Sequence, residues 1–380
     1  MSADVEEKVV VRGLEDVVAA ETKISYVDGV NGQLYYQGYN LDELAGRTTF
    51  AETVYLLWYA KLPNAREVKT FRARLVSEMR LPTQVAMMIQ SAPAGAHPMC
   101  VLRTIVSALG MFDPDVEDMS DEANESKAIR LTAQVPTIIA DLHRVRAGKP
   151  LLSPDPKLGF AANFLYMFRG APPDEIEEKA FDLTMMLHAD HGMNASTFAG
   201  RVTVSTLADL HSGLTSALGT LKGPLHGGAN ERVMEMLMDI QRPDVVESYI
   251  NGMLENKQRI MGFGHRVYKT EDPRARHLRA VSRTLCERAR MPHLFEISQS
   301  IEKIVRERKG INPNVDFYSA SVQHALNIPK EYFTTIFAAA RTPGWLAHMR
   351  EQLADNRLIR PTSKYTGRYD LKWQPVDQRP

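Results

Sequence analysis

The segment GPLHGGAN, residues 223–230, places one histidine where a helix is about to begin. His226 stands between a Gly-Pro turn and a Gly-Gly step, and apolar residues of helical period follow from Asn230. The N-terminal end of a helix disfavours a nearby positive charge, so this imidazole is expected to be neutral at pH 7. A neutral imidazole can polarise a carbonyl group while an enolate develops. The alternative is a histidine that only packs and hydrogen-bonds at a turn.

A second segment, IMGFGHRVYKTEDPRARHL at residues 260–278, combines glycines, a histidine and arginines. Asp272 followed by Pro273 is typical of a helix N-cap and first helical position, which puts Arg274 in the first turn and close to His265. Flexible glycine backbone with open N–H groups beside cationic side chains indicates an anion pocket.

A carboxylate among apolar residues characterises a third segment, INPNVDFYSASVQHAL at residues 311–326. Asp316 is flanked by Val315 and Phe317, and loss of solvation would make its carboxylate a stronger base. The alternative is that Asp316 is the N-cap of a helix predicted over Ser319–Leu326.

The segment LHADHGMNAST, residues 187–197, crowds His188, Asp190 and His191 into one turn. Such residues are metal ligands in other proteins, but their spacing does not follow the HExxH pattern. A histidine interacting with the last carbonyls of a helix is the alternative, and no metal is expected here.

The elements around these segments are predicted to be mostly helical. Residues 22–41 alternate β-forming residues with Asp-Gly and Asn-Gly, which predicts short hairpin strands. Helical periodicity then dominates, including helices over 50–62, 129–142 and 179–188, separated by short Pro/Gly/Asp breaks. A mainly α fold with short N-terminal strands is therefore expected.

Composition narrows the class of protein. The formal net charge is +0 at pH 7, so no overall basic field is available to attract nucleic acid or an anionic membrane. Residues 257–290 nevertheless concentrate Lys and Arg, which indicates either a site for a multiply charged small anion or a solvated helix face. The N-terminus has no apolar signal segment, no stretch is long and apolar enough to span a bilayer, and the two cysteines, Cys100 and Cys286, form no CxxC motif. A cytoplasmic location is expected.

Taken together, GPLHGGAN, IMGFGHRVYK with the following DPRA, NVDFYSA and HADHGMNAST resemble, in content and order, the citrate synthase family. The resemblance is closest to the compact bacterial and archaeal type and extends from GLEDVVAAETKISYVDGVNGQLYYQGY to RLIRPTSKYTG. It implies a mainly helical, two-domain homodimer. Residues 1–222 and 329–380, with a C-terminal arm, would form the large domain, and residues 223–328 the small domain that closes over the active site.

The resemblance also implies the reaction and the roles of individual residues. Acetyl-CoA and oxaloacetate would condense, and thioester hydrolysis would release citrate and CoA, with no metal and no cofactor. Asp316 would remove the acetyl proton, His226 would stabilise the enolate and His265 would polarise the oxaloacetate carbonyl. Four further residues would bind substrate: His191, Arg274, Arg341 and Arg360, the last of which would reach the partner subunit's site. The candidates for CoA binding are Lys257, Arg259, Ile260, Met261, Gly262, Phe263, Gly264, Arg266 and Lys269.

Three alternatives stay open at this point. A 2-methylcitrate synthase would use the same catalytic residues with propionyl-CoA, one methylene larger. Tyr318 after Phe317 in the NVDFYSA loop favours the citrate-forming type. A metal-dependent hydrolase would rest on His188, Asp190 and His191. A catalytically silent scaffold is disfavoured by the intact set of two histidines and one aspartate.

Overall fold

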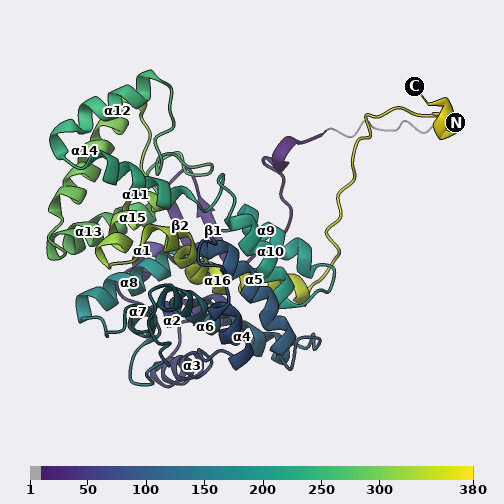
Figure 1. Cartoon of the computed structure of the whole chain (residues 1–380), viewed down its shortest axis with the longest axis horizontal. Coiled ribbons are helices and arrows are strands. Elements are labelled where there is room, and N and C mark those ends of the chain that lie inside the picture. Colours follow the sequence, from purple (N-terminus) through teal and green to yellow (C-terminus); the bar gives the residue numbers. More distant parts are fainter. Residues whose placement is uncertain (1–9, 380) are drawn as a thin grey trace.

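The structure, a computed structural model, describes residues 10–379 and consists mainly of helices (Figure 1). Its strands form one antiparallel sheet in the order β1-β2-β3, with bounds Ser25–Asp28, Gln33–Tyr36 and Tyr39–Asn40. Ser25 pairs with Tyr36 at one end of β1 and Asp28 with Gln33 at the other. The predicted N-terminal hairpin is therefore confirmed.

Ten α-helices follow the sheet and make up the first part of the helical body. Several begin at capping boxes, in which the N-cap side chain and the glutamate three residues on bond each other's backbone N–H groups; Thr49 with Glu52 is one. The predicted 129–142 helix is the middle of a longer one, α6. The bounds are α1 Leu41–Leu44, α2 Phe50–Tyr59, α3 Ala65–Ser77, α4 Thr83–Gln90, α5 Pro98–Leu109, α6 Asp121–Arg146, α7 Phe160–Arg169, α8 Glu175–His188, α9 Ala195–Val204 and α10 Leu210–Leu221.

Five helices, α11 to α15, pack mainly on one another and lie together at one side of the molecule (Figure 1). Their bounds are α11 Ala229–Ile240, α12 Val246–Glu255, α13 Pro273–Arg288, α14 Pro292–Lys309 and α15 Val315–Ala325. They fall within the segment predicted to be the small domain, residues 223–328. Whether this segment moves as a unit stays a prediction.

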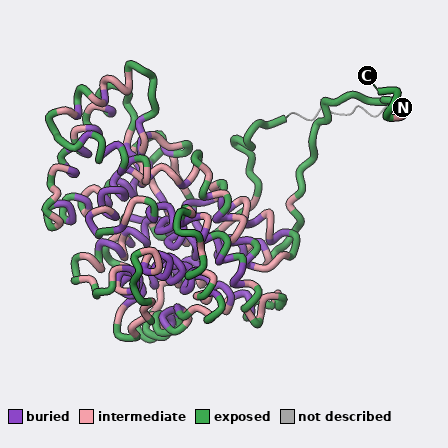
Figure 2. The backbone as a smooth tube through the Cα atoms, viewed as in Figure 1, coloured by how far each residue is buried: buried purple, intermediate pink, exposed green. Residues whose placement is uncertain are grey.

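Helix α16, Phe333–Ala354, runs through the centre of the molecule and is buried along most of its length (Figure 2). It packs against α6, α8, α9, α10 and α11. Three of its buried side chains, those of Arg341, Trp345 and His348, hydrogen-bond to the segments around His188, Asp190 and Ser196. A central helix with this content positions side chains for the site as well as filling the core.

Both terminal segments leave the helical body (Figure 1). Beyond α16 the chain is exposed and irregular, and it carries large apolar side chains such as Leu358, Tyr365 and Trp373. Within residues 10–379, no helix has both the length and the apolar character needed to cross a membrane. Residues 1–9, on which the prediction of no signal segment partly depends, lie outside the described residues.

Candidate active site

His226 precedes α11, whose N-cap is Gly228. Its Nε2 lies 2.8 Å from Oγ of Ser196, in the first turn of α9, and that oxygen also accepts a hydrogen bond of 3.0 Å from Trp345 Nε1. Burial, with a contribution from the charge of Arg341, lowers the pKa of His226 to about 4. The imidazole is neutral as predicted, but burial rather than the helix end is the main cause.

His265 is held in one tautomer by the backbone that follows it. Its Nδ1 accepts hydrogen bonds from the N–H groups of Val267, at 3.0 Å, and Tyr268, at 3.1 Å. Burial and then the charge of Arg274 lower the pKa of His265 to about 4, so the ring is neutral at pH 7. Because Nδ1 accepts, the ring proton is on Nε2, which can donate to a substrate oxygen.

His191 joins His265 at the same place. Their ring centroids are 5.0 Å apart, and Nε2 of His191 lies 3.2 Å from the hydroxyl of Tyr268. Burial, followed by the charge of Arg274, holds the pKa of His191 well below its ordinary value. The site therefore contains three neutral imidazoles near buried cationic groups.

Arg274 is a buried cation with a bidentate partner. Its Nε and Nη2 donate to Asp272 at 3.0 and 2.8 Å, and Asp272 also caps α13 by accepting from the Arg274 N–H at 3.0 Å. Asp272 and Pro273 thus occupy the predicted N-cap and first helical positions. Asp272 accepts a further bond from the N–H of Val315, at 3.1 Å, and so joins the starts of α13 and α15.

Arg341 is a buried cation that forms no salt bridge with a carboxylate of residues 10–379. Its Nε donates to the carbonyl of His188, whereas Nη2 is shielded from solvent and has no hydrogen-bond partner within residues 10–379. Burial lowers the pKa of Arg341 to about 10, although the charge of Asp190 opposes this shift. A guanidinium with a free N–H donor is suited to binding a carboxylate group of a ligand.

Asp316 stands in the first turn of α15 and is partly buried. The N-cap is Asn314, whose side chain accepts from the Asp316 N–H at 3.0 Å, so the interpretation of Asp316 as an N-cap is wrong, and the helix begins before the predicted Ser319. Oδ1 of Asp316 is shielded and has no hydrogen-bond partner among the described residues. Burial raises the pKa of this carboxyl to about 7, which makes it a proton acceptor near neutral pH.

The glycine segment beside His265 is less open than predicted. Gly262 and Gly264 have φ values of +80° and +78°, in the left-handed region that favours glycine. The N–H of Gly264 donates to the carbonyl of Asn312 at 3.0 Å, and the carbonyl of Gly262 accepts from the N–H of Asn314 at 2.9 Å. The expectation of freely available N–H groups is therefore wrong for Gly264. The pairing instead fixes this segment beside the Asp316 turn.

The cluster of cations over residues 257–290 divides into two sets. Members on α13 form ion pairs with carboxylates: Arg276 with Asp42, Arg279 with Glu271 and Glu302, Arg283 with Glu287, and Arg288 with Asp174. The second set is exposed and forms no salt bridge within the described part of the chain: Lys257, Arg259, Arg266 and Lys269 around the glycine segment, and Arg290 after α13. The solvated-face interpretation thus fits the first set, and the second set remains available to an anion.

His188, Asp190 and His191, the three residues considered as metal ligands, each contact a different group, and that of His191 is the Tyr268 hydroxyl. His188 Nδ1 lies 2.7 Å from the carbonyl of Thr184, and Asp190 lies 3.1 Å from His348 Nε2. No group of three or more His, Cys, Asp or Glu side chains is arranged to hold a metal within residues 10–379.

One predicted site residue is not brought to the others. Arg360 is exposed in the segment after α16, next to Ile359, whose N–H donates to Ser205 Oγ at 3.1 Å. The sequence-based reasoning also missed Ser196, Tyr268 and Trp345. Ser196 and Tyr268 lie within segments already singled out, but their contacts with His226 and His191 join distant parts of the chain.

Comparison with known proteins assigns the family. The model of the family "Citrate synthase, C-terminal domain" matches residues 13–362. The chain belongs to the citrate synthase family. It is 47% identical to citrate synthase 2 of Bacillus subtilis over 97% of this chain and 99% of that protein. It is 39% identical to 2-methylcitrate synthase 1 of Corynebacterium glutamicum, over 97% of this chain and 98% of that protein.

A solved citrate synthase agrees in fold. The enzyme of Thermoplasma acidophilum, in ternary complex with carboxymethyl coenzyme A and oxaloacetate, superposes with a TM-score of 0.92 at 32% identity, covering 98% of this chain and all of that one (100%). The predicted mainly α citrate synthase fold is confirmed, as is the prediction of an acyltransferase that forms citrate. The catalytically silent scaffold and the metal-dependent hydrolase are not supported by any of these relatives.

Proposed function

We propose that the protein condenses acetyl-CoA with oxaloacetate and hydrolyses the resulting thioester to citrate and CoA. The observation that carries the proposal is Asp316, a shielded carboxylate with an unpaired oxygen and a pKa of about 7. The charge of Arg341 perturbs both this carboxyl and His226, which indicates that the base and the neutral imidazole share one site.

Enolisation is the first step of the proposed reaction. Asp316 takes a proton from the acetyl methyl group, and the electron pair moves onto the thioester oxygen. Because the methyl group is a weak acid, this step needs a donor aimed at that oxygen. His226 supplies the donor from Nδ1 when the Ser196 hydroxyl donates to Nε2 instead of to its other acceptor, Asn194 Oδ1 at 2.7 Å. Its low pKa keeps the ring neutral at the pH at which Asp316 is ionised.

Carbon–carbon bond formation follows at the oxaloacetate carbonyl. The enolate carbon attacks the carbonyl carbon, and the proton on His265 Nε2 passes to the new alkoxide. Arg274, Arg341 and His191 bind the dicarboxylate and present this carbonyl. The free Nη2 of Arg341 supports its role as a carboxylate ligand. Water then hydrolyses the thioester.

The CoA moiety is assigned to the glycine segment and the exposed cations next to it. Ile260, Met261, Gly262, Phe263 and Gly264 run beside the Asp316 turn, where the acetyl group has to lie. The phosphates are assigned to the four unpaired cations around the glycine segment, which are Lys257, Arg259, Arg266 and Lys269.

Several properties of the assembly belong to the same proposal. The protein acts as a homodimer in which Arg360 enters the partner subunit's site, and its exposure outside its own site supports this placement. Residues 223–328 close over the substrates. No metal or cofactor takes part. A cytoplasmic location is supported by two free cysteines, Cys100 and Cys286.

Acetyl-CoA is proposed over propionyl-CoA as the preferred thioester. Phe317 and Val233 pack so closely on Gly262 that a methyl group there would lie 2.9 and 2.8 Å from their side chains. This packing fixes Gly262 beside the base, and the smaller acyl group is supported by the higher identity to citrate synthase 2 (47%) than to 2-methylcitrate synthase 1 (39%). One methylene gives limited discrimination, roughly 10- to 200-fold, so slow use of propionyl-CoA is compatible with the proposal.

The test is free thiol release from acetyl-CoA and, separately, from propionyl-CoA, in the presence of oxaloacetate and with or without EDTA. The expected result is faster release from acetyl-CoA that is unchanged by EDTA. Faster release from propionyl-CoA would assign the 2-methylcitrate reaction instead. No release from either thioester would overturn the proposal, and loss of activity in EDTA would overturn the metal-free mechanism.

A further inference from the structure

We propose that the turn between β1 and β2, residues 28–32, is a positioning element for the loop that carries His265, and that Gly29 sets the place of this histidine. The inference rests on the proposed role of His265 in polarising the oxaloacetate carbonyl. It assigns a role in the reaction to an N-terminal hairpin that is more than two hundred residues away in the sequence.

Three consecutive backbone N–H groups after His265 are used to fix it. Those of Val267 and Tyr268 donate to His265 Nδ1, at 3.0 and 3.1 Å. The next, on Lys269, donates to the carbonyl of Gly29 at 2.8 Å. The short segment 267–269 therefore contacts the imidazole at one end and the β1–β2 turn at the other, so a shift of the turn moves the imidazole.

The fit between the turn and this loop depends on two glycines. A Cβ atom on Gly29 would lie 2.2 Å from the carbonyl oxygen of Val267, and one on Gly32 would lie 2.6 Å from Cγ2 of Thr270. Both distances are far below van der Waals contact, so any side chain would push the two backbones apart. Gly32 also has a φ of +65°, which disfavours other residues.

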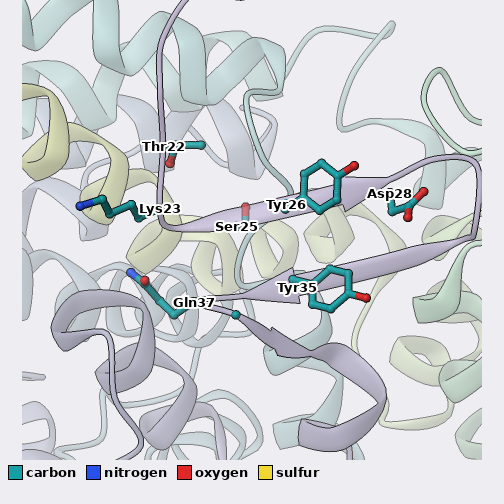
Figure 3. Close-up of a pocket in the computed structure, with 8 residues that line it drawn as sticks. Thr22, Lys23, Ser25, Tyr26, Asp28, Tyr35 and Gln37 are labelled. Atoms are coloured by element: carbon teal, nitrogen blue, oxygen red, sulfur yellow. The ribbon is translucent and has the colours of Figure 1, made fainter.

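Hydrogen bonds fix both ends of β1, the strand that leads into the turn. At one end, Asp28 accepts hydrogen bonds from the N–H groups of Val30, at 3.1 Å, and Asn31, at 2.9 Å. At the other end, the Ser25 hydroxyl donates to buried Asp190 and accepts from the N–H of Gly192 at 3.0 Å. Figure 3 shows Ser25 and Asp28 along β1, beside Tyr35 on β2.

This arrangement links the two histidines proposed to hold oxaloacetate. Asp190 directly precedes His191, so the Ser25 end of β1 is tied to the His191 loop. The Gly29 end is tied to the His265 loop. The hairpin thus spans from one histidine-bearing loop to the other, in addition to the direct contact between His191 and Tyr268. A hairpin placed in this way contributes to the distance between the two rings, together with that direct contact.

The test compares Gly29→Ala with Gly95→Ala. Gly95 is the matched control because a Cβ there meets nothing within 4 Å. A third variant, Asp28→Ala, loosens the turn without adding an atom to the contact. The readouts are kcat for thiol release, the thermal midpoint, and the ¹³C chemical shift of oxaloacetate labelled at its carbonyl carbon and bound to the protein. That shift reports carbonyl polarisation, which a merely structural role would not change in a folded variant.

In Gly29→Ala, kcat is expected to fall about 100-fold, and the bound carbonyl signal is expected to move toward its value in free oxaloacetate. Asp28→Ala is expected to show smaller changes of the same kind in kcat and in the carbonyl signal. Gly95→Ala is expected to change neither. If Gly29→Ala does not fold, Asp28→Ala decides. A folded variant at residue 28 or 29 with an unchanged carbonyl signal and kcat would overturn the inference. Absence of thiol release by the unaltered protein would instead refute the proposed function.

Discussion

The hydroxyl oxygen of Ser196 lies 2.8 Å from Nε2 of His226, in the only hydrogen bond recorded for that imidazole within residues 10–379. Because the indole N–H of Trp345 can only donate, Ser196 Oγ accepts from it, and the single Ser196 proton goes to one of two acceptors, Asn194 Oδ1 at 2.7 Å or His226 Nε2. Donation of that proton to Nε2 leaves the ring proton on Nδ1. When Ser196 donates to Nε2 rather than to Asn194, it selects the tautomer in which His226 can donate to a thioester oxygen.

Replacing Ser196 with alanine is expected to lower kcat by roughly tenfold to a hundredfold, because the tautomer loses about 1–3 kcal/mol of support. The apparent affinity for oxaloacetate should change little. Steady-state kinetics measure both quantities. Ser216→Ala is the control, since this hydroxyl contacts a backbone carbonyl on α9. Equal losses in both variants would show that Ser196 supports only the packing of α9.

The pH dependence should follow Asp316. Its pKa of about 7 predicts that kcat/KM rises with pH up to about 7 and then levels off. His226 and His265, with pKa values of about 4, add no acid limb until far lower pH. A profile that is flat from pH 5 to 9 would contradict the assignment of Asp316 as the titrating base.

The same raised pKa predicts an effect on stability. From about pH 4 to 7 the folded protein holds a proton on Asp316 that the unfolded chain releases, so this group's contribution to the free energy of unfolding falls as pH rises. At pH 8 the ionised carboxylate is a net cost. Asp316→Asn is therefore expected to be more stable than the unaltered protein at pH 8, by on the order of 2 kcal/mol, and no more stable at pH 4. Denaturant titrations at the two pH values measure this difference.

Features decided by neighbouring residues could be predicted from the sequence. The Asp272–Pro273 start of α13 and the hairpin before residue 41 depend on local backbone chemistry, and both are confirmed. The alternative in which Asp316 caps α15 stays open in the sequence, because Asn314 and Asp316 are both good caps and only the helix start separates them. The neutrality of His226 was predicted, but its cause, burial, depends on distant parts of the chain and has no local signal.

Arg341 should show opposing effects on stability and binding. In Arg341→Met, a buried charge with an unpaired Nη2 is replaced by an apolar group of similar length, so the thermal midpoint of the ligand-free protein should be unchanged or higher. Oxaloacetate should stabilise the unaltered protein by about 2.7 kcal/mol at a concentration of 100 times Kd, and this effect should be lost in the variant. Thermal scans with and without oxaloacetate test both statements. A retained oxaloacetate shift would remove Arg341 from the binding site.

The proposed contribution of Arg360 to the partner subunit's site predicts complementation. Homodimers of Arg360→Ala and of His226→Ala should each be nearly inactive. After the two are unfolded and refolded together, mixed dimers contain one site with both native residues, so activity should recover to about a quarter of that of the unaltered protein on statistical grounds. Refolding each variant alone is the control. No recovery on mixing would show that Arg360 acts within its own subunit or not at all.

Turnover by Asp316→Asn tests the central claim, that this carboxylate removes the acetyl proton. Asparagine keeps the shape of the side chain but cannot accept the proton, so the rate of thiol release should fall by roughly a hundredfold to ten-thousandfold. Oxaloacetate binding, measured by calorimetry, should stay within a few-fold of that of the unaltered protein because Arg274 and Arg341 are intact. Near-normal turnover by a folded Asp316→Asn protein would contradict the account.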